Sequence, residues 1–272
     1  MFASLFKLLN NDMPINKWYM VSFIKHMSII PNGFFSFLRK GQNRRNFDLQ
    51  VNVHQTKKKF GAEKHRLKTS KMINKIMIST DSMEYKKLCE KIGIKVPFLR
   101  PSEISQDSST DIEFILHALD WLSENDEEPD FLVHIRPTTP LRCPNLIDDA
   151  IKKFLNKPQY TSLRSVHEMS ESAYKNFEIM SDGSLVSVFS HQKNLDTSNL
   201  ARQSFPKTYV PNGYVDVLRT SYVRENNLIH GDNVMSYITN VVTEVDNEAD
   251  FEFLEYQVSS DPSLQKKVFI RE

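Results

Sequence analysis

Two carboxylates alternate near the end of the chain, in the segment Thr243-Glu244-Val245-Asp246. In an extended segment alternate side chains point to the same side, so Glu244 and Asp246 would lie together. Two hard oxygen ligands of this kind suit Mg²⁺, which keeps water ligands and takes others from substrate phosphates. The alternative is that Glu244 is a surface residue and Asp246 caps the next helix, and the four residues alone favour this alternative.

Arginines mark a second candidate site. Arg136 and Arg142 flank a rigid Pro-Thr-Thr-Pro turn at 137–140. Guanidinium groups fixed in this way suit carboxylate or phosphate recognition, although two exposed arginines on a proline loop would give the same pattern. Arg100 follows a short apolar stretch and Arg202 ends a polar one. Each of these two is a weak signal by itself.

Other polar side chains allow a functional or a structural role. Asp81 follows an apolar run and would face a metal or a ribose, or cap the next helix. Asn212 stands in a Pro-Asn-Gly sequence, where it either contacts a ligand or adopts the turn conformation. His117 and His134 lie on apolar faces, so we expect them in the core. The sequence shows no Cys/His or Ser/His/Asp arrangement, and it therefore does not support a covalent nucleophile.

Strands and helices alternate in the middle of the chain. We predict strands at 76–78, 95–98 and 131–135 and helices at 82–92, 110–122 and 144–155. This order predicts an α/β fold with a mostly parallel sheet and helices on both faces. Ligands of such sheets bind at the carboxyl ends of the strands, where Asp81 and the loop 136–142 lie.

The pattern changes in the second half. Asp182-Gly183 between apolar flanks predicts a hairpin within 174–189, and the polar segment 191–202 predicts an excursion from the sheet. The alternation then resumes with a predicted strand at 214–218, helix at 221–226, strand at 239–242 and helix from Ala249.

The composition limits the class of protein. The chain has 272 residues, 40% of them hydrophobic, with a mean hydropathy of -0.44. This length makes one large domain or two small ones. No stretch approaches the ~18 apolar residues of a membrane helix, the start lacks a signal-peptide pattern, and two cysteines cannot form a disulfide framework. We therefore expect a cytoplasmic protein with no membrane attachment.

Glycine content and charge distribution are unusual. Only 7 residues are glycine, so a Gly-rich phosphate loop is hardly available. The first 75 residues carry 15 basic and 3 acidic side chains, and the remainder carries 20 and 31. A basic front on an acidic body indicates an arm for nucleic acid or anionic lipid, or a segment of different origin. Because no nucleic-acid motif is present, a non-catalytic binding module remains only an alternative.

Seven short phrases, taken together and in order, resemble one family. They are Ile78–Asp81, Val96–Glu103, Ile115–Leu119, Arg136–Arg142, Arg202-Gln203 with Pro206-Lys207, Pro211–Gly213, and Glu244–Asp246 with Asp250-Phe251. The chain from about Leu67 to Glu255 is thereby similar to the acylneuraminate cytidylyltransferases, or CMP-sialic acid synthetases. The resemblance implies a Rossmann-like nucleotidyltransferase fold. It also implies that the anomeric hydroxyl of a sialic-acid-like, nine-carbon keto-sugar acid attacks the α-phosphate of CTP and releases pyrophosphate.

The resemblance also implies roles for single residues. Metal binding would fall to Glu244 and Asp246, cytidine binding to Asp81, Arg100, Thr110 and Asp111, and sugar-acid binding to Arg136, Arg202 and Asn212. Asp246 and Arg202 would be catalytic, and the segment 163–210 would form a homodimer.

Three of these positions depart from the usual family residues. Glu244 replaces an Asp, Asp111 replaces a small residue, and Arg136 replaces the Gln of many sialate enzymes. The arginine at position 136 indicates that the substrate is a relative of sialic acid that still carries a carboxylate.

The front of the chain departs from the family pattern. The family's first strand runs into a Gly-rich loop that binds the triphosphate. Here Ser28–Pro31 resembles the opening of that strand, and Met27 is a plausible start. The resemblance then stops and returns near Leu67. We therefore predict an atypical basic region at 1–66 and a cytidylyltransferase-like domain at 67–272.

We hypothesise that residues 32–66 are out-of-frame or otherwise foreign sequence and that residues 1–26 are an upstream extension. If residues 32–66 form a loop over the strand ends, this would support activity, whereas a detached, disordered segment would not. Without the triphosphate loop the enzyme would be impaired and CTP binding weak. A sister nucleotidyltransferase that uses another base or another sugar acid would share the same phrases and remains the second alternative.

Overall fold

A computed structural model describes residues 18–24, 27–30, 34–37, 72–91, 94–136, 138–189 and 194–261. In the first three ranges the description covers the backbone strands alone. The hypothesis about residues 32–66 therefore falls almost wholly outside the described residues.

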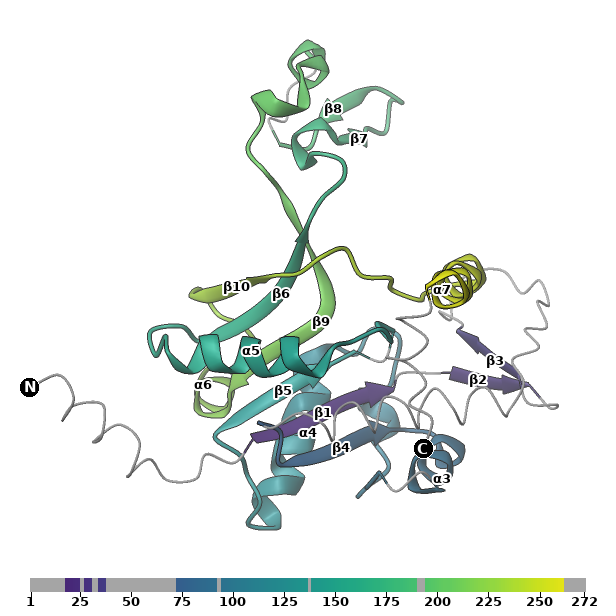
Figure 1. Ribbon diagram of the computed structural model, residues 1–272, viewed down its shortest axis with the longest axis vertical. Helices are drawn as coiled ribbons and strands as arrows, with labels where there is room; N and C mark the ends of the chain where they lie inside the picture. Colours follow the sequence, from purple (N-terminus) through teal and green to yellow (C-terminus); the bar gives the residue numbers. More distant parts are fainter. Residues whose placement is uncertain are drawn as a thin grey trace, which may run out of the picture.

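A six-stranded sheet with the order β10-β6-β9-β5-β1-β4 forms the centre of the molecule (Figure 1). Its strands are β1 (Trp18–Ile24), β4 (Lys75–Thr80), β5 (Phe131–Ile135), β6 (Ser162–Glu168), β9 (Tyr209–Arg219) and β10 (Val234–Ile238). The pairs β1–β4, β1–β5 and β6–β10 are parallel, whereas β9 runs antiparallel to β5 and β6. The predicted mostly parallel sheet is confirmed, with β9 as the exception.

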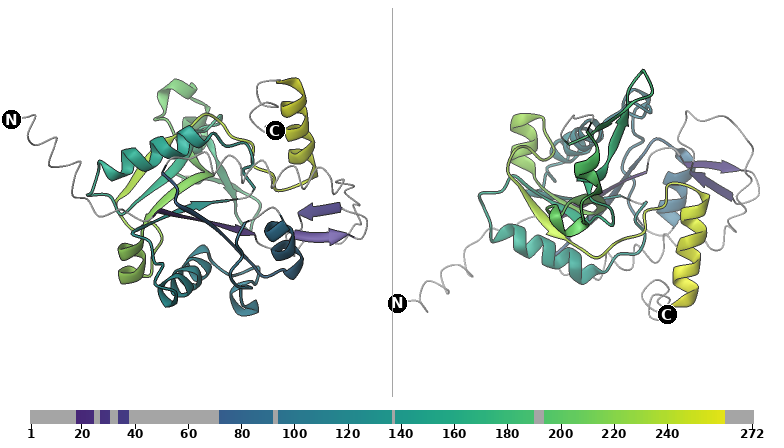
Figure 2. Two further views of the ribbon diagram at one scale, coloured as in Figure 1. Left: turned by 60° about the horizontal axis from the view of Figure 1, so that its bottom comes forward. Right: turned by 90° about the horizontal axis from the view of Figure 1, so that it is seen from above.

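Helices cover both faces of the sheet, as predicted (Figure 2). The helices of the described residues are α3 (Met83–Lys91), α4 (Asp111–Glu124), α5 (Pro144–Leu155), α6 (Thr220–Asn226) and α7 (Glu248–Ser260), of which α7 lies beside the sheet. Alternate residues of β5 point to opposite faces of the sheet. Val133 packs in the core with Ile151 of α5, and Leu132 packs in the core with Leu119 of α4. None of the helices in the described ranges has both the length and the apolar character that crossing a bilayer requires.

The helix ends follow local sequence signals. The Glu113 carboxylate accepts hydrogen bonds from the backbone N–H and the hydroxyl of Thr110, so this box fixes the first turn of α4. Pro144 occupies the first turn of α5, where its missing N–H costs nothing. The Ser82 hydroxyl accepts a hydrogen bond from the N–H of Tyr85 at 3.4 Å and caps α3.

The predicted hairpin and excursion are present. Strands β7 (Phe177–Ile179) and β8 (Leu185–Ser187) pair in an antiparallel manner, and Gly183 turns between them with a φ of +79°. Figure 1 shows this unit projecting from the sheet, beyond the end of β6 and the start of β9. Three short 3-10 helices, η2 (Ala173–Lys175), η3 (Asp196–Asn199) and η4 (Arg202–Ser204), complete the excursion.

Two predicted strands were wrong. The run 95–98 makes a single bridge, from Lys95 to Met77, because the chain leaves the sheet edge at once. The strand expected at 239–242 lies earlier, at Val234–Ile238, where alternate side chains pair with β6. The residues after it form a connection, in which Val241 is 75% exposed.

The first strand of the sheet also differs from the expectation. Trp18–Ile24 occupies the position between β4 and β5, so the hypothesis that residues 1–26 are an upstream extension is wrong for this strand. The run Ser28–Pro31, expected to open the first strand, falls instead on β2 (Met27–Ile30), which pairs with β3 (Phe34–Phe37) in a separate two-stranded sheet. Six of the seven residues of β1 pair with the six residues of β4, whereas β2 has only four residues.

Candidate functional site

The candidate residues gather at the carboxyl ends of the parallel strands. Asp81 directly follows β4, Arg136 directly follows β5, and the segment with Glu244 and Asp246 follows β10. This is the edge at which α/β sheets bind ligands. The sequence-based placement of Asp81 and the 136–142 loop is therefore confirmed.

Arg100 is a buried, oriented cation beside Asp81. Its side chain is held by a hydrogen bond from Nε to the Ser105 hydroxyl (2.9 Å), and its Nη2 lies 3.7 Å from Asp81 Oδ1. The backbone N–H of Arg100 donates to the carbonyl of Thr80 at 2.8 Å, and Arg100 is only 3% exposed. Burial lowers the pKa of Arg100 and the Asp81 carboxylate opposes this shift. Asp81 therefore acts as an ion-pair partner, and Ser82, not Asp81, is the helix cap.

Arg136 joins the end of β5 to the start of α4. Its Nη2 donates to the carboxylate of Asp111, the first residue of α4. The Arg100 guanidinium lies over the ring of Phe114, one turn further along the same helix, at 5.4 Å. The N-terminal turn of α4 therefore links the Asp81–Arg100 pair to Arg136. Asp111, which the resemblance assigned to cytidine, contacts a residue assigned to the sugar acid.

Glu244 is tied to the loop after β5. The Thr138 hydroxyl donates to Glu244 Oε1 at 3.1 Å, and the carbonyl of Thr138 accepts a hydrogen bond from the N–H of Val245 at 2.8 Å. Val245 is 3% exposed, whereas Glu244 is half-buried and Asp246 is exposed. The alternation expected for Glu244 and Asp246 is therefore present.

The helix that follows is capped by other residues. The Asn247 side chain accepts a hydrogen bond from the N–H of Asp250, and the Asp250 carboxylate accepts from the N–H groups of Asp246 and Asn247 at 3.0 and 3.1 Å. Helix α7 is thus capped by Asn247. The alternative that Asp246 is a helix cap is wrong, because Asn247 holds that position.

Two predicted site residues lie elsewhere or are turned inward. Arg202 lies in the excursion, where its Nη2 contacts Glu168 Oε1 (3.4 Å) and the carbonyl of Met169 (3.0 Å). Asn212 is 2% exposed, and its Nδ2 donates to the Thr239 hydroxyl at 2.7 Å. Neither is brought to the other candidates as a free ligand-binding group, because ordered contacts within the fold hold both.

Asn212 does not lie in a turn. It belongs to β9, and Gly213 takes the left-handed conformation with a φ of +60° next to a register shift between β9 and β6. The Asn212 side-chain oxygen accepts a hydrogen bond from the N–H of Tyr214 at 3.2 Å. The turn interpretation offered by the sequence is thus corrected, because a bulged strand can also use a Pro-Asn-Gly sequence.

The profile of a family described as cytidylyltransferase matches residues 64–223. The chain belongs to the cytidylyltransferase family. This agrees with the parallel strand edge and with the grouping of Arg100, Asp111, Arg136 and Glu244 along it. The family consists of nucleotidyltransferases, so the predicted enzyme class is confirmed.

Named relatives support the expected branch of the family. The cytidylyltransferase is 30% identical to post-translational flagellin modification protein B of Campylobacter coli over 74% of this chain and 84% of that protein. It is 27% identical to N-acylneuraminate cytidylyltransferase of Escherichia coli over 67% of this chain and 42% of that protein. CMP-N,N'-diacetyllegionaminic acid synthase of Campylobacter jejuni is also 27% identical, over 70% and 79%. The resemblance to CMP-sialic acid synthetases is confirmed.

Solved structures support the fold. A CMP:2-keto-3-deoxy-manno-octonic acid synthetase complexed with CTP superposes with a TM-score of 0.56, at 11% identity, over 90% of this chain and 99% of that one. A 4-diphosphocytidyl-2C-methyl-D-erythritol synthase of Anaerococcus prevotii superposes with a TM-score of 0.54, at 9% identity, over 90% and 100%. The Rossmann-like nucleotidyltransferase fold is therefore confirmed.

Arg142 of the cytidylyltransferase has a role that sequence reasoning missed. It is 4% exposed, and it donates from Nε to the carbonyl of Tyr214 (2.7 Å) and from Nη2 to the carbonyls of Gly213 (2.8 Å) and Arg136. Arg142 therefore fastens the loop after β5 to β9. The alternative of an exposed side chain at this position is therefore wrong.

A row of charged side chains under α4 was also missed. His134 of β5 and Arg164 of β6 both lie opposite Asp216 of β9, and His134 Nδ1 is 3.8 Å from Asp216 Oδ2. Burial raises the pKa of Asp216 to about 6 and lowers the pKa of His134 well below its usual value. The prediction that His134 is a core histidine is confirmed, and the half-buried His117 packs its ring 4.6 Å from that of Phe98.

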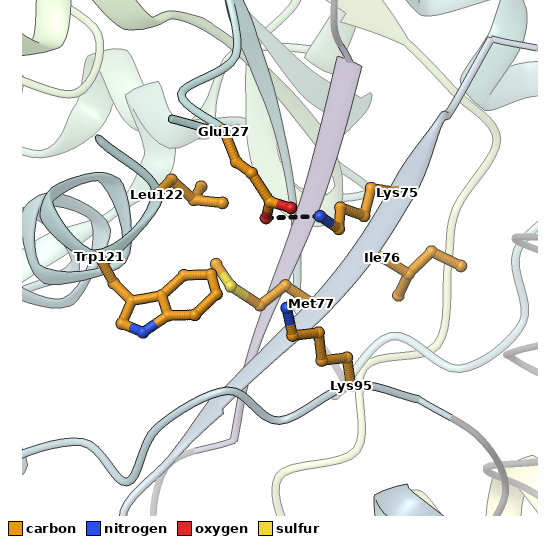
Figure 3. A pocket seen from close by; sticks show the side chains of 7 residues that line it. All are labelled: Lys75, Ile76, Met77, Lys95, Trp121, Leu122 and Glu127. Carbon is orange, nitrogen blue, oxygen red and sulfur yellow. Dashed lines mark ion pairs between the residues drawn. The ribbon is translucent and has the colours of Figure 1, made fainter. Parts of the chain in front are cut away.

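A pocket of the cytidylyltransferase lies away from this site (Figure 3). It is lined by Lys75, Ile76, Met77, Lys95, Trp121, Leu122 and Glu127. The Lys75 ammonium pairs with Glu127 at 2.5 Å, and the Lys95 ammonium lies 4.8 Å from the Trp121 ring centroid. The pocket adjoins the first residues of β4, whereas the site residues follow the last.

Proposed function

We propose that the chain transfers CMP from CTP to the anomeric hydroxyl of a sialic-acid-like, nine-carbon keto-sugar acid and releases pyrophosphate. The observation that carries the proposal is the arc of contacts from Asp81 through Arg100, the first turn of α4 and Arg136 to Glu244. The names of the relatives support a sugar acid as acceptor. Phosphoryl transfer needs mainly positioning and charge stabilisation, and this arc contains groups for both.

The acidic end of the arc fits a magnesium ion. Glu244 and Asp246 offer carboxylates from alternate positions, and Val245 between them is anchored in the core. Among the described residues no group of three or more His, Cys, Asp or Glu side chains could hold a metal ion. Two protein carboxylates suffice for Mg²⁺ at a triphosphate, because water and phosphate oxygens complete its shell. When bound, the ion would neutralise charge that develops on the phosphates.

The two arginines of the arc would bind different substrates. Arg100 is held rigidly by Ser105 and Asp81 and would contact the nucleotide, with Thr110 at the start of α4 nearby. Arg136, which is 36% exposed in its side chain, would contact the carboxylate of the sugar acid. Arg100 would thus contribute a fixed charge on the nucleotide side of the site and Arg136 on the sugar-acid side.

A homodimer formed through the excursion is part of the proposal. The hairpin region exposes large apolar side chains, among them Ile179 (77%), Phe189 (65%) and Leu200 (52%). Such a surface on a projecting unit favours burial against a second copy. Arg202 lies away from the arc of contacts in its own protomer. Its expected catalytic role therefore requires that the excursion of one protomer reaches the arc of the partner protomer.

The test is a turnover assay with the full chain. CTP, UTP, ATP and GTP are each combined with MgCl₂ and with N-acetylneuraminic or N,N'-diacetyllegionaminic acid, and pyrophosphate and the product mass are measured. Of the four nucleotides, we expect only CTP to give pyrophosphate and a nucleotide sugar, which is a CMP-sugar. Preference for another nucleotide would establish the sister-enzyme alternative. No turnover, together with salt-sensitive DNA binding that is lost when basic residues of 1–66 outside β1 are replaced by neutral ones, would establish the binding module.

The triphosphate loop is tested separately. Its expected position lies mostly among residues outside the described ranges, so the structure does not test whether it is missing. Calorimetry with CTP and MgCl₂ measures this directly. Weak binding is expected if the loop is absent, and micromolar affinity would contradict its absence.

A further inference from the structure

We propose that Asp111 is a positioning residue that holds Arg136 as a preformed receptor for the carboxylate of the sugar acid. The proposal rests on the proposed function and assigns Asp111 to the acceptor side of the reaction, not to cytidine. It follows from the way in which three parts of Arg136 are held.

The charged head of Arg136 is held by Asp111. Nη2 donates to Asp111 Oδ2, and the two side chains are 36% and 30% exposed. Asp111 is itself fixed, because it is the first residue of α4 and the Thr110–Glu113 hydrogen bonds close the turn around it. A carboxylate at this position also interacts favourably with the N-terminal end of the helix dipole.

The stem of Arg136 lies against Gly213. A Cβ atom at Gly213 would lie 2.9 Å from Arg136 Cδ, which is closer than such atoms approach. The absence of a side chain at Gly213 therefore leaves room for the arginine stem against β9. The Thr139 hydroxyl lies 3.3 Å from the same Cβ position.

The backbone of Arg136 is held by Arg142. The buried Arg142 guanidinium donates to the carbonyl of Arg136 and to that of Gly213, so one side chain joins both segments. Backbone, stem and head of Arg136 are thus all fixed before substrate binds. Preorganised guanidinium groups bind carboxylates with little loss of conformational entropy.

Asp111 leaves donors of Arg136 for a substrate. A guanidinium carries five N–H donors, and the hydrogen bond to Asp111 uses one nitrogen, Nη2. A half-exposed head with donors remaining can take a second carboxylate while Asp111 keeps the plane of the group fixed. In this arrangement Asp111 acts through Arg136 and needs no contact with substrate.

A double-mutant cycle tests this role. Asp111→Asn, Arg136→Gln and the double variant are compared with wild type for KM of the sugar acid and KM of CTP. We expect Asp111→Asn to raise KM for the sugar acid about tenfold and to leave KM for CTP within twofold. In the Arg136→Gln background it should add less than a twofold further effect, because its partner is gone. Asp111→Glu should restore part of the loss, and Asp107→Asn, an exposed acid four residues earlier, should change neither KM.

Two results would overturn the proposal. A rise in KM for CTP with Asp111→Asn would show that Asp111 serves the nucleotide, and multiplicative effects in the double variant would show that it does not act through Arg136. Thermal unfolding of each variant checks the fold, and Asp111→Ser, which also suits a helix start, replaces Asp111→Asn if that variant does not fold.

A binding measurement separates this proposal from the proposed function. Calorimetry with N-acetylneuraminic acid and CTP, without MgCl₂, measures binding in the absence of turnover. Weaker binding to Asp111→Asn than to wild type supports the positioning role even when no CMP-sugar forms. Equal binding to the two, or none to wild type, would overturn it.

Discussion

The Thr138 hydroxyl donates a hydrogen bond of 3.1 Å to Glu244 Oε1 across 106 positions of the sequence. This contact joins the loop after β5 to the segment after β10, and it brings the proposed metal-binding carboxylates to the same edge as Arg136. It also fixes one of the two oxygens of Glu244.

Replacing Thr138 by Val tests this contact. The side chains have nearly the same shape, but valine cannot orient the carboxylate. Partners of this kind are worth about 10- to 100-fold in metal affinity. We expect the MgCl₂ concentration for half-maximal pyrophosphate release to rise about tenfold in Thr138→Val and to stay near the wild-type value in Thr138→Ser. An unchanged magnesium requirement in Thr138→Val would show that the hydroxyl does not tune the site.

Two glycines with positive φ form a matched pair. Gly213 (φ +60°) faces Arg136, whereas a Cβ at Gly183 (φ +79°) would meet nothing within 4 Å. Both Ala variants carry backbone strain of about 1–3 kcal/mol, but only Gly213→Ala displaces Arg136. We expect KM for the sugar acid to rise several-fold in Gly213→Ala and to remain unchanged in Gly183→Ala. Equal kinetic behaviour of the two variants would contradict this explanation.

The buried Asp216 predicts a pH-dependent stability. Its folded-state pKa of about 6 lies above the ordinary value of 3.8, so the folded state binds more protons and this group lowers stability as pH rises from about 4 to 6. The pKa of His230, lowered to about 4 by burial, has the opposite effect over about pH 4 to 6.5. The two contributions partly cancel in the wild type.

Asp216→Asn removes one of these opposing contributions. Denaturant unfolding from pH 4 to 7 should show Asp216→Asn gaining stability relative to wild type by about 2 kcal/mol between pH 4 and 6, from a shift of about two pKa units. A stability difference that is constant over this range would mean that Asp216 is not titrating there.

The excursion predicts a dimer that one substitution disrupts. Ile179 is 77% exposed on β7, and a charge there would be buried in the proposed interface. Ile179→Lys should convert a dimer to a monomer in analytical ultracentrifugation. Val241→Lys, at an apolar residue that is 75% exposed outside the excursion, should leave the dimer intact. A wild-type monomer at micromolar concentration would contradict the predicted assembly.

Local patterns in the sequence were sufficient for much of the fold. The strand at 131–135 and the helix at 144–155 were predicted with their observed bounds, because apolar runs and Pro144 mark them clearly. The alternation of Glu244 and Asp246 around an apolar residue was also readable. The strand at 234–238 was missed because the next residues, 239–242, have similar β-forming composition, and only pairing with β6 selects between them.

Other features depend on contacts that no local pattern contains. Arg136 and Arg142 looked equivalent at the ends of one turn, yet Arg142 is buried because carbonyls of Gly213 and Tyr214, some 70 positions later, accept its hydrogen bonds. The Asp111–Arg136 pair likewise joins two elements that are distant in sequence. The inward role of Asn212 was hidden because a bulged strand and a turn use the same residues.

The central claim is that the carboxylates after β10 support transfer of CMP at this edge of the sheet. Pyrophosphate release from CTP, MgCl₂ and an N-acylneuraminate, compared between wild type and Asp246→Asn, tests it most directly, with Glu252→Gln on the exposed surface of α7 as control. We predict a loss of at least about 100-fold in Asp246→Asn and an unchanged rate in Glu252→Gln. Wild-type activity in Asp246→Asn would contradict the claim.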